Sequence, residues 1–455
     1  MSLLRRRDAL ILGFFGSAGL AQGLRGTYAA ASDASSAINP LSPKLPHFPA
    51  KAKRVIQIFM PGGVSHIDTF DPKPALTRDD GKVMRKGRVL AKSMWGFGHG
   101  GASGLEISDL FPKLRDQADE LCLIRSMHGD KGDHFEATLS IHSGAIAGAL
   151  PGIGAWVSFG MGTDNPNLPS HVVFCQKLPY AGSQSWGSNF LPAYHQGTRI
   201  VPGDDPISNL KPDPKTASQQ DLELGLLRDL NQRHYQTRST DSRLAARMYA
   251  YDAAIGLQQT APEVFDLRNE TQATLDLYGI KSGDTNSFAW QCLMARRMSE
   301  RGVRFIELID KGASGNWDAH SNMKSYEKLA KNVDQPIAGL IQDLKQRGLL
   351  EETLIVCCTE FGRTADVKEE QRDGRDHYKN AFTCWLAGGG VRGGTTYGAT
   401  DEYGINIAEK PAHINDFHAT ILRLLGFDHE RLTYFYNGRD FRLTGLAGNV
   451  LDVIA

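Results

Sequence analysis

Ionisable side chains gather just after several apolar, strand-like runs of this sequence. In an open parallel sheet, the carboxyl ends of the strands form the ligand crevice, so these residues are expected to meet there. Carboxylates gathered in one crevice repel one another, and a divalent cation relieves that repulsion. Carboxylates mixed with imidazoles suit zinc or manganese. Four clusters follow such runs: Ser65/His66/Asp68, His128/Asp130/Asp133/His134, Asp318/His320 and Glu360/Arg363. The loop pair Asp376/His377 adds a fifth.

Spacing favours Asp318 and His320 as a pair of metal ligands. The two residues are two positions apart and follow Gly315 and Asn316, which favour an extended loop. In extended backbone both side chains point the same way, whereas on a helix they would diverge by about 200°. The alternative is a loop anchored by Trp317 in which Asp318 is only an exposed acid.

The stretch after the apolar run 354–358 offers a second set of roles. Asp376 and His377 are adjacent, so their side chains would point apart in a strand. One is therefore expected to bind the metal, and the other to orient a ligand or to make a structural contact. Glu360 is a candidate ligand or general base. Arg363 is a candidate clamp for an anionic oxygen, and the alternative is an ion pair between Glu360 and Arg363.

The residues after the first two predicted strands keep their alternatives open. His66 and Asp68 are equally expected as metal ligands or as hydrogen-bond partners within a loop. His134 is a candidate catalytic imidazole, and the alternative is that it only begins a helix. Ser65 with His66 would make a metal-free hydrolase, although an adjacent Ser-His pair rarely has triad geometry.

Alternating strands and helices must position these clusters, and their order predicts an α/β fold with a doubly wound, mostly parallel sheet. Residues 217–300 are predicted to form a helical insertion, and 71–117 and 179–215 to be irregular. The strands are expected at 54–60, 121–127, 171–175, 303–309, 354–358 and 382–387. The helices are expected at 134–142, 152–160, 325–347 and 413–425.

The first residues predict an export signal. Arg5-Arg6-Arg7 precede an apolar stretch from Ala9 to about Ala21, which is too short to span a membrane, and a small-residue cleavage site follows. This pattern matches a twin-arginine signal, with a Sec signal or an uncleaved anchor as alternatives. We therefore expect a signal peptide at 1–31, a single domain at 32–455, and a periplasmic or extracellular location.

Composition excludes several classes of protein. The 51 Lys and Arg residues balance 51 Asp and Glu residues, so no nucleic-acid or anionic-membrane partner is expected. The six cysteines form no CxxC pair, which disfavours a zinc ribbon and favours buried free thiols.

Five segments are long enough to be specific, and together they resemble the DUF1501 family of exported bacterial proteins. The match extends over about residues 55–452. The resemblance implies similarity to the alkaline phosphatase superfamily, which includes sulfatases, and hence an alkaline-phosphatase-like fold with one or two metal ions at the strand ends. The segments are PGGVSHIDTFDPKP, NWDAHSN, TEFGRT, GRDHY and HATILRLLGFDHERLTYFYNGRD.

Several departures from the superfamily limit what the resemblance implies. Glu360 stands where the Asp of an Asp-His pair is expected, and the next residue is Phe361, so a second metal site would lack a ligand. No C-x-P-x-R motif surrounds a cysteine, so a formylglycine sulfatase is not expected. The superfamily's nucleophile would follow the strand 121–127, where no single Ser or Thr stands out. The candidate hydroxyls there are Ser126, Thr138 and Ser140.

These observations together predict an exported, metal-dependent hydrolase of phosphate or sulfate esters. The substrate would be an anionic ester, with sulfated or phosphorylated glycans as candidates, and the cofactor a zinc, manganese or calcium ion. The alternative is a catalytically inactive protein that binds or scaffolds such glycans. The candidate catalytic residues are Glu360, Arg363, Ser65 and His134, and the candidate metal ligands are Asp68, His66, Asp318, His320, Asp376 and His377.

Overall fold

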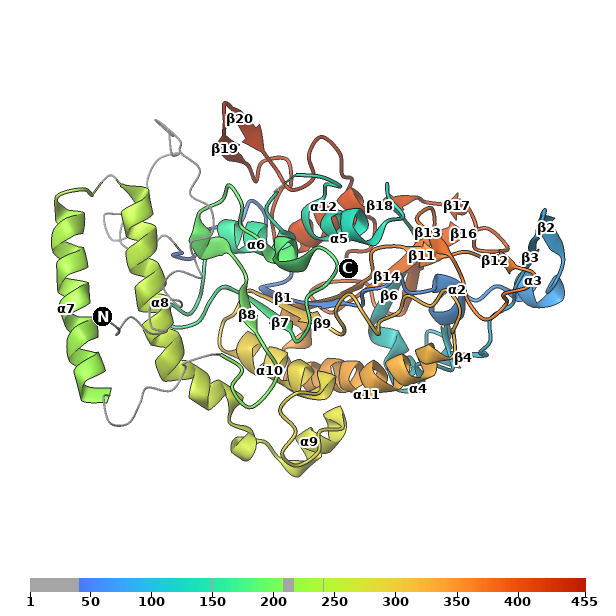
Figure 1. Cartoon of the computed structure of the whole chain (residues 1–455), viewed down its shortest axis with the longest axis horizontal. Helices are drawn as coiled ribbons and strands as arrows, with labels where there is room; N and C mark the ends of the chain where they lie inside the picture. Colours follow the sequence, from blue (N-terminus) through green and yellow to red (C-terminus); the bar gives the residue numbers. More distant parts are fainter. Residues whose placement is uncertain (1–40, 149, 208–216, 240) are drawn as a thin grey trace, which may run out of the picture. The chain divides into compact units, whose positions relative to one another are not determined.

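A nine-stranded sheet forms the centre of the computed structural model, which describes residues 41–148, 150–207, 217–239 and 241–455 (Figure 1). The predicted signal peptide at 1–31 lies outside these ranges. Eight strands follow the order β15-β6-β14-β10-β1-β9-β7-β8, and β18 also pairs with β6. Their bounds are β1 Arg54–Phe59, β6 Leu121–His128, β7 His171–Cys175, β8 Thr198–Ile200, β9 Phe305–Ile309, β10 Thr353–Cys358, β14 Phe382–Ala387, β15 Thr395–Tyr397 and β18 Ala412–His413.

The sheet is mixed but mostly parallel, which confirms the predicted fold class. Only β14 runs antiparallel to its neighbours, β10 and β6. The central strands are almost continuously apolar because both faces of the sheet are covered. Phe59 of β1 lies level with Ile309 of β9 and Cys358 of β10. These three strands therefore end at the same edge of the sheet, where their loops can meet.

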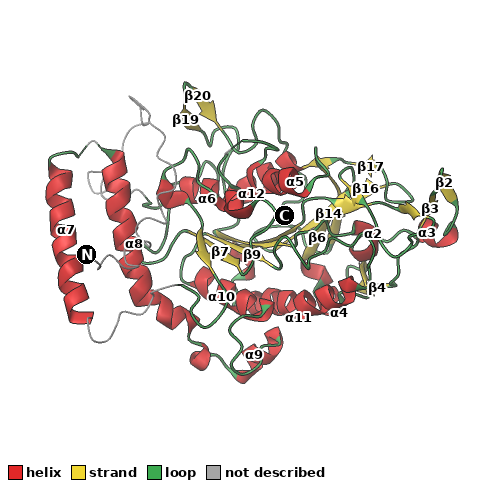
Figure 2. Ribbon diagram, viewed as in Figure 1, coloured by secondary structure: helices red, strands yellow, loops and turns green. Residues whose placement is uncertain are grey.

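Helices cover both faces of the sheet, as Figure 2 shows. Alternate residues of β1 separate two cores: Ile56 and Ile58 pack in one, and Val55 and Phe59 in the other. The first core lies against α4 Pro112–Arg115, α9 Gln272–Tyr278, α10 Phe288–Glu300 and α11 Ser325–Gln346. The second lies against α5 His134–Ser143, α6 Ile153–Met161 and α12 Ile414–Leu424.

The segment 217–300 is mainly helical, with α7 Ala217–Gln236 and α8 Ser242–Phe265 preceding α9 and α10. In the parts of the chain that are described, no helix is both long and apolar enough to cross a membrane. All six cysteines are buried and free, as expected.

The region 71–117, expected to be irregular, instead holds short strands that hydrophobic periodicity does not reveal. They belong to small sheets at the periphery, β12-β3-β2 and β4-β5. The remaining elements are α2 His66–Thr69, α3 Pro74–Arg78, β2 Val83–Arg85, β3 Arg88–Leu90, β4 Phe97–Gly100, β5 Leu105–Ser108, β11 Gly362–Arg363, β12 Asp366–Lys368, β13 His377–Tyr378, β16 Ala399–Thr400, β17 Ile407–Glu409, β19 Tyr434–Tyr436 and β20 Arg439–Phe441, with 3-10 turns at Ala118–Glu120, Gly182–Trp186, Ala193–His195, Leu267–Asn269 and Leu350–Glu352.

Candidate metal centre

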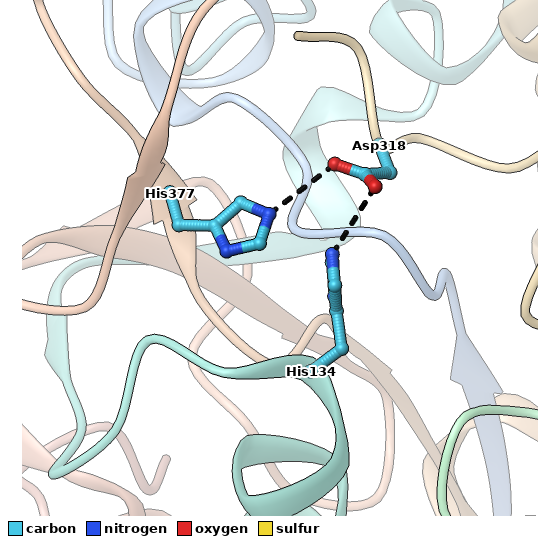
Figure 3. Close-up of side chains that lie close together, drawn as sticks. All are labelled: His134, Asp318 and His377. Carbon is cyan, nitrogen blue, oxygen red and sulfur yellow. Dashed lines mark hydrogen bonds and ion pairs between the residues drawn. The ribbon is translucent and has the colours of Figure 1, made fainter.

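Three residues that are far apart in the sequence converge at the carboxyl edge of the sheet. His134 is the first residue of α5, Asp318 lies in the loop after β9, and His377 begins β13. One ligand atom from each lies within 4.8 Å of the others. Figure 3 shows both imidazoles pointing at the Asp318 carboxylate from two different segments of the chain. The arrangement is that of a metal site assembled by the fold rather than by a local motif.

Local structure explains why the ligands lie there. Asp133 caps α5 by accepting a hydrogen bond from the Phe135 amide at 3.0 Å, so the helix begins at His134. The loop after β1 packs directly on the loop of Asp318. Gly62 in that loop has a φ of 112°, and a Cβ there would lie 2.5 Å from the Asp318 nitrogen. Only glycine allows this close approach.

The Asp318 carboxylate is the centre of the group. Its Oδ2 lies 3.4 Å from His134 Nε2, and its Oδ1 lies 3.3 Å from His377 Nε2. A third imidazole, His320, brings its Nε2 to 3.1 Å from the same Oδ1. Burial raises the pKa of Asp318, but hydrogen bonds from His134, His377 and Arg363 outweigh it and hold that pKa well below its usual range. The carboxylate is therefore ionised at any working pH.

Each imidazole uses its Nδ1 for an acceptor outside the group, which fixes the role of its other nitrogen. An acceptor at Nδ1 requires the proton there, so Nε2 is the atom that can offer a lone pair to a metal. The Nε2 atoms of His320 and His377 face each other at 3.0 Å, and that of His134 is buried with the Asp318 carboxylate 3.4 Å away. The three acceptors are Glu360 Oε1 at 2.7 Å from His134, the Gly132 carbonyl at 2.8 Å from His377, and Asp376 Oδ1 at 3.4 Å from His320.

The donor set fits a zinc or manganese ion. Two or three imidazole nitrogens and one carboxylate are common ligands for both metals. Calcium, which the sequence left as a candidate, prefers six to eight oxygen donors, and three nitrogens do not fit that preference. A cation would also separate the facing Nε2 atoms of His320 and His377.

Aromatic rings hold the imidazoles in place. Tyr180 stacks on His134 with the ring centroids 4.0 Å apart and the planes 6° apart, and its hydroxyl accepts a hydrogen bond from Asn316. Phe361 is fully buried and lies 4.8 Å from the His134 ring and 4.6 Å from the His377 ring. Tyr180 belongs to a stretch without periodicity, so no sequence signal pointed to it.

Protonation of His134 competes with metal binding. Burial lowers the pKa of this imidazole, but hydrogen bonds with Asp318 and Glu360 outweigh burial and raise the pKa to about 8. At neutral pH a cation must therefore displace a proton from His134.

Glu360 and Asp376 orient imidazoles and lie behind them. Glu360 is buried, and it accepts hydrogen bonds from the Gly62 amide at 2.8 Å and from Thr359 at 3.2 Å in addition to His134. Asp376 lies between His320 and Arg88, whose guanidinium is 2.7 Å away. The buried position of Glu360 does not resemble that of a solvent-facing general base. Carboxylates that hold the outer nitrogen of a ligand histidine are usual around metals.

Arg363 does not have the position of the anion clamp expected from the sequence. Its side chain is fully buried, with no face toward solvent. The Arg363 guanidinium connects the loop after β1 with the loop before β13, and it neutralises part of the Asp318 charge. It donates to the carbonyls of Gly63 at 2.8 Å, Arg375 at 3.0 Å and Gly62, and to Asp318 Oδ1 at 2.6 Å.

Ser65, His66 and Asp68 form a separate buried cluster, and the structure does not bring them into the metal group. Ser65 donates to Asp68 at 2.5 Å, and Asp68 pairs with Arg375 at 2.7 Å. His66 uses Nε2 for the Gly404 carbonyl at 2.9 Å. Arg375 neutralises Asp68 from a position 307 residues later in the chain. The sequence spacing gave no sign of that pairing.

The three hydroxyls that the sequence offered as nucleophiles are all inside the protein. Ser126 and Thr138 are fully buried, and Ser140 is 2% exposed. Ser126 also donates to the Lys410 carbonyl at 2.6 Å. None of these three side chains can reach a substrate held at the metal group.

Comparison with solved structures returns distant likenesses. The lipoteichoic acid synthase LtaP from Listeria monocytogenes is 10% identical with a TM-score of 0.38, over 87% of this chain and 78% of that one. The PsFucS1 sulfatase from Pseudoalteromonas sp. is 13% identical with a TM-score of 0.35, over 87% and 72%. Alkaline phosphatase from the Antarctic bacterium TAB5 is 11% identical with a TM-score of 0.36, over 83% and 99%.

TM-scores below 0.5 assign no activity to this chain. Among proteins of curated function, none matches the sequence significantly. The sequence model of DUF1501, described as a protein of unknown function, matches residues 52–455. The chain therefore belongs to the DUF1501 family.

Proposed function

We propose that this protein is an exported, metal-dependent hydrolase of phosphate or sulfate esters. The observation that supports a metal is the convergence of imidazole Nε2 atoms on the ionised Asp318 carboxylate, each ring held from behind by an acceptor. The ester class comes from the resemblance of the motifs around Asp318, Glu360 and His377 to the alkaline phosphatase superfamily.

Each residue of the group has a distinct role in this proposal. His134, Asp318 and His377 would hold the ion, with His320 beside them at the more exposed side of the group. When bound, such an ion supplies Lewis-acid chemistry, which polarises the ester oxygen and makes water a better nucleophile. Glu360 fixes the tautomer of His134, and Tyr180 and Phe361 fix the planes of the rings.

A binding protein without catalysis is the second candidate, and two observations favour it. Ser126, Thr138 and Ser140 are buried, so none of them can act as a nucleophile on a bound ester. Asp318 is already paired with the Arg363 guanidinium at 2.6 Å, which weakens it as a metal ligand. Such a protein would hold sulfated glycans or similar anions and leave them unchanged.

The two candidates are separated by assaying purified, untagged protein for metal content and for turnover of phosphate monoesters, phosphate diesters and sulfate esters. The hydrolase proposal expects about one zinc or manganese per chain and turnover that a chelator abolishes. Asp318→Asn and His377→Ala should lose both, whereas Asp130→Asn, an exposed acid outside the group, should lose neither. Bound metal without turnover of any ester would favour the binding protein.

We also propose that residues 1–31 direct export by the twin-arginine route, with residues 32–455 forming one domain. The paired arginines Arg6 and Arg7, one spacer and an apolar stretch support this proposal. In a bacterial host, the Arg6→Lys/Arg7→Lys variant should accumulate in the cytoplasm while the wild type is found outside it. Equal export of both would refute the twin-arginine route.

A further inference from the structure

Helix α5, which carries His134 at its first position, has little apolar surface to hold it in place. Eight of its ten residues are buried, yet most of these are small or polar, including Ala137, Thr138, Ser140 and Ser143. A helix normally keeps its rotation and axial position by packing an apolar stripe into the core. Helix α5 needs another means of holding its position.

Two imidazole–carboxylate pairs supply that means, one at each end of the helix. At the start, His134 Nδ1 lies 2.7 Å from Glu360, just after β10. In the last turn, His142 Nε2 lies 2.6 Å from Glu307 in the middle of β9. The two histidines are eight residues apart, which is about 12 Å along a helix. The pairs therefore fix both ends of α5 to different strands of one sheet.

The His142–Glu307 pair is charged and fully enclosed. Besides Glu307, His142 directs its Nδ1 at the Thr138 carbonyl, 2.7 Å away. With Glu307 ionised, both ring nitrogens face acceptors, so both donate and the ring is an imidazolium. Burial lowers the pKa of His142, but the charge and hydrogen bond of Glu307 outweigh burial and raise it. The side chains are 1% and 2% exposed.

A carboxylate at position 307 is unexpected, because its neighbours on the same face of the strand are apolar. It lies in β9 between β1 and β7, on the face where Phe305 and Ile309 join the second core. A buried ion pair seldom adds net stability over apolar residues of similar size. Its effect here is on position. Strand β9 leads into the loop of Asp318, and α5 begins with His134, so the pair joins the two elements that carry these ligands.

We propose that His142 and Glu307 are positioning residues that set His134 Nε2 against the Asp318 carboxylate and thereby set the metal affinity of the site. This inference rests on the proposed metal-dependent function. It extends that function to a pair of side chains that touch neither metal nor substrate.

The test compares three proteins for zinc binding, by competition with a chromophoric chelator, and for the visible spectrum of their cobalt(II) forms. Glu307→Gln keeps the size of the side chain and one acceptor but removes the charge. Leu340→Ala is the matched control, because Leu340 is fully buried in α11 on the opposite face of the sheet. Denaturation establishes that both variants are folded and destabilised.

Glu307→Gln should weaken zinc binding by more than about twofold, though by less than the roughly 10- to 100-fold expected when the direct partner of a metal ligand is lost, and should shift the cobalt(II) absorption bands. Leu340→Ala should change neither. If Glu307→Gln does not fold, Glu307→Asp takes its place, with the charge retained but withdrawn by one methylene, and the cobalt(II) bands should still shift. Affinity within twofold of wild type and an unchanged spectrum would overturn the inference. A wild-type protein that binds neither metal would overturn the proposed function as well.

Discussion

Replacing Arg363 with lysine should destabilise the protein strongly, although the positive charge is kept. The guanidinium is fully buried and donates hydrogen bonds to three backbone carbonyls and to Asp318. A lysine ammonium is a single nitrogen at the end of a flexible chain and cannot reproduce that fork. The carbonyls come from both the loop after β1 and the loop before β13, so one nitrogen cannot reach all of them.

The expected loss follows from the number of acceptors left without a donor. If lysine reaches two of the four, two buried acceptors lose theirs, and a hydrogen bond to a charged donor contributes about 1.5–3 kcal/mol. The free energy of unfolding should therefore fall by about 3–6 kcal/mol. Typical domains have only about 5–15 kcal/mol in total.

Urea denaturation followed by tryptophan fluorescence measures this change. Arg372→Lys is the control, because that arginine is 43% exposed and makes a surface ion pair with Asp80, which contributes at most about 1 kcal/mol. If Arg363→Lys were as stable as the wild type but bound inorganic phosphate or sulfate more weakly, Arg363 would be an anion clamp. The structural role described above would then be wrong.

Three further predictions concern Asp310, which directly follows β9 and is buried, and Tyr180 and Glu360, which hold His134. Burial raises the pKa of Asp310 from 3.8 to about 6. The neutral carboxyl group therefore stabilises the folded protein fully below about pH 4, and this stabilisation is lost as the pH rises through 6. Relative to Asp310→Asn, the wild type should lose about 3 kcal/mol between pH 4 and 7, and parallel pH profiles would contradict this. Tyr180→Leu should weaken zinc binding roughly two- to tenfold through lost stacking on His134, whereas Tyr180→Phe should not, as titration with zinc will show. Glu360→Gln should weaken zinc binding about 10- to 100-fold, and an affinity equal to wild type would exclude its role in orienting His134.

The central strands could be predicted because burial on both faces leaves continuous apolar runs. Strands β1, β7, β10 and β14 all lie within a residue or two of their predicted bounds. The antiparallel direction of β14 could not be predicted, because a strand reads the same in either direction. The short strands between residues 83 and 108 could not be predicted, since strands of three or four residues show too little alternation to detect.

The candidate site was only partly visible in the sequence. Asp318 was expected as a metal ligand because it follows a predicted strand, and His377 because it lies in the charged loop after 354–358 and resembles a histidine ligand of the superfamily. The structure brings the two residues together. His134 was expected either to act in catalysis or only to begin a helix. It begins α5, and its place in the metal group depends on how that helix docks.

Long-range pairing decided the remaining residues. Asp68 was expected as a metal ligand, but it pairs with Arg375, which lies 307 residues later in the chain. Arg363 was expected to bind an anion, but its guanidinium donates its hydrogen bonds to backbone carbonyls. Spacing along a chain reveals which residues share an element. It does not reveal which distant charge each one meets.

Anomalous diffraction at the zinc edge, from crystals of the untagged protein grown with zinc, tests the central claim most directly. We expect one strong peak with the Nε2 atoms of His134 and His377 and an oxygen of Asp318 at about 2.0–2.2 Å from it. Density that shows these side chains bonded only to one another, with any zinc bound elsewhere, would contradict the account.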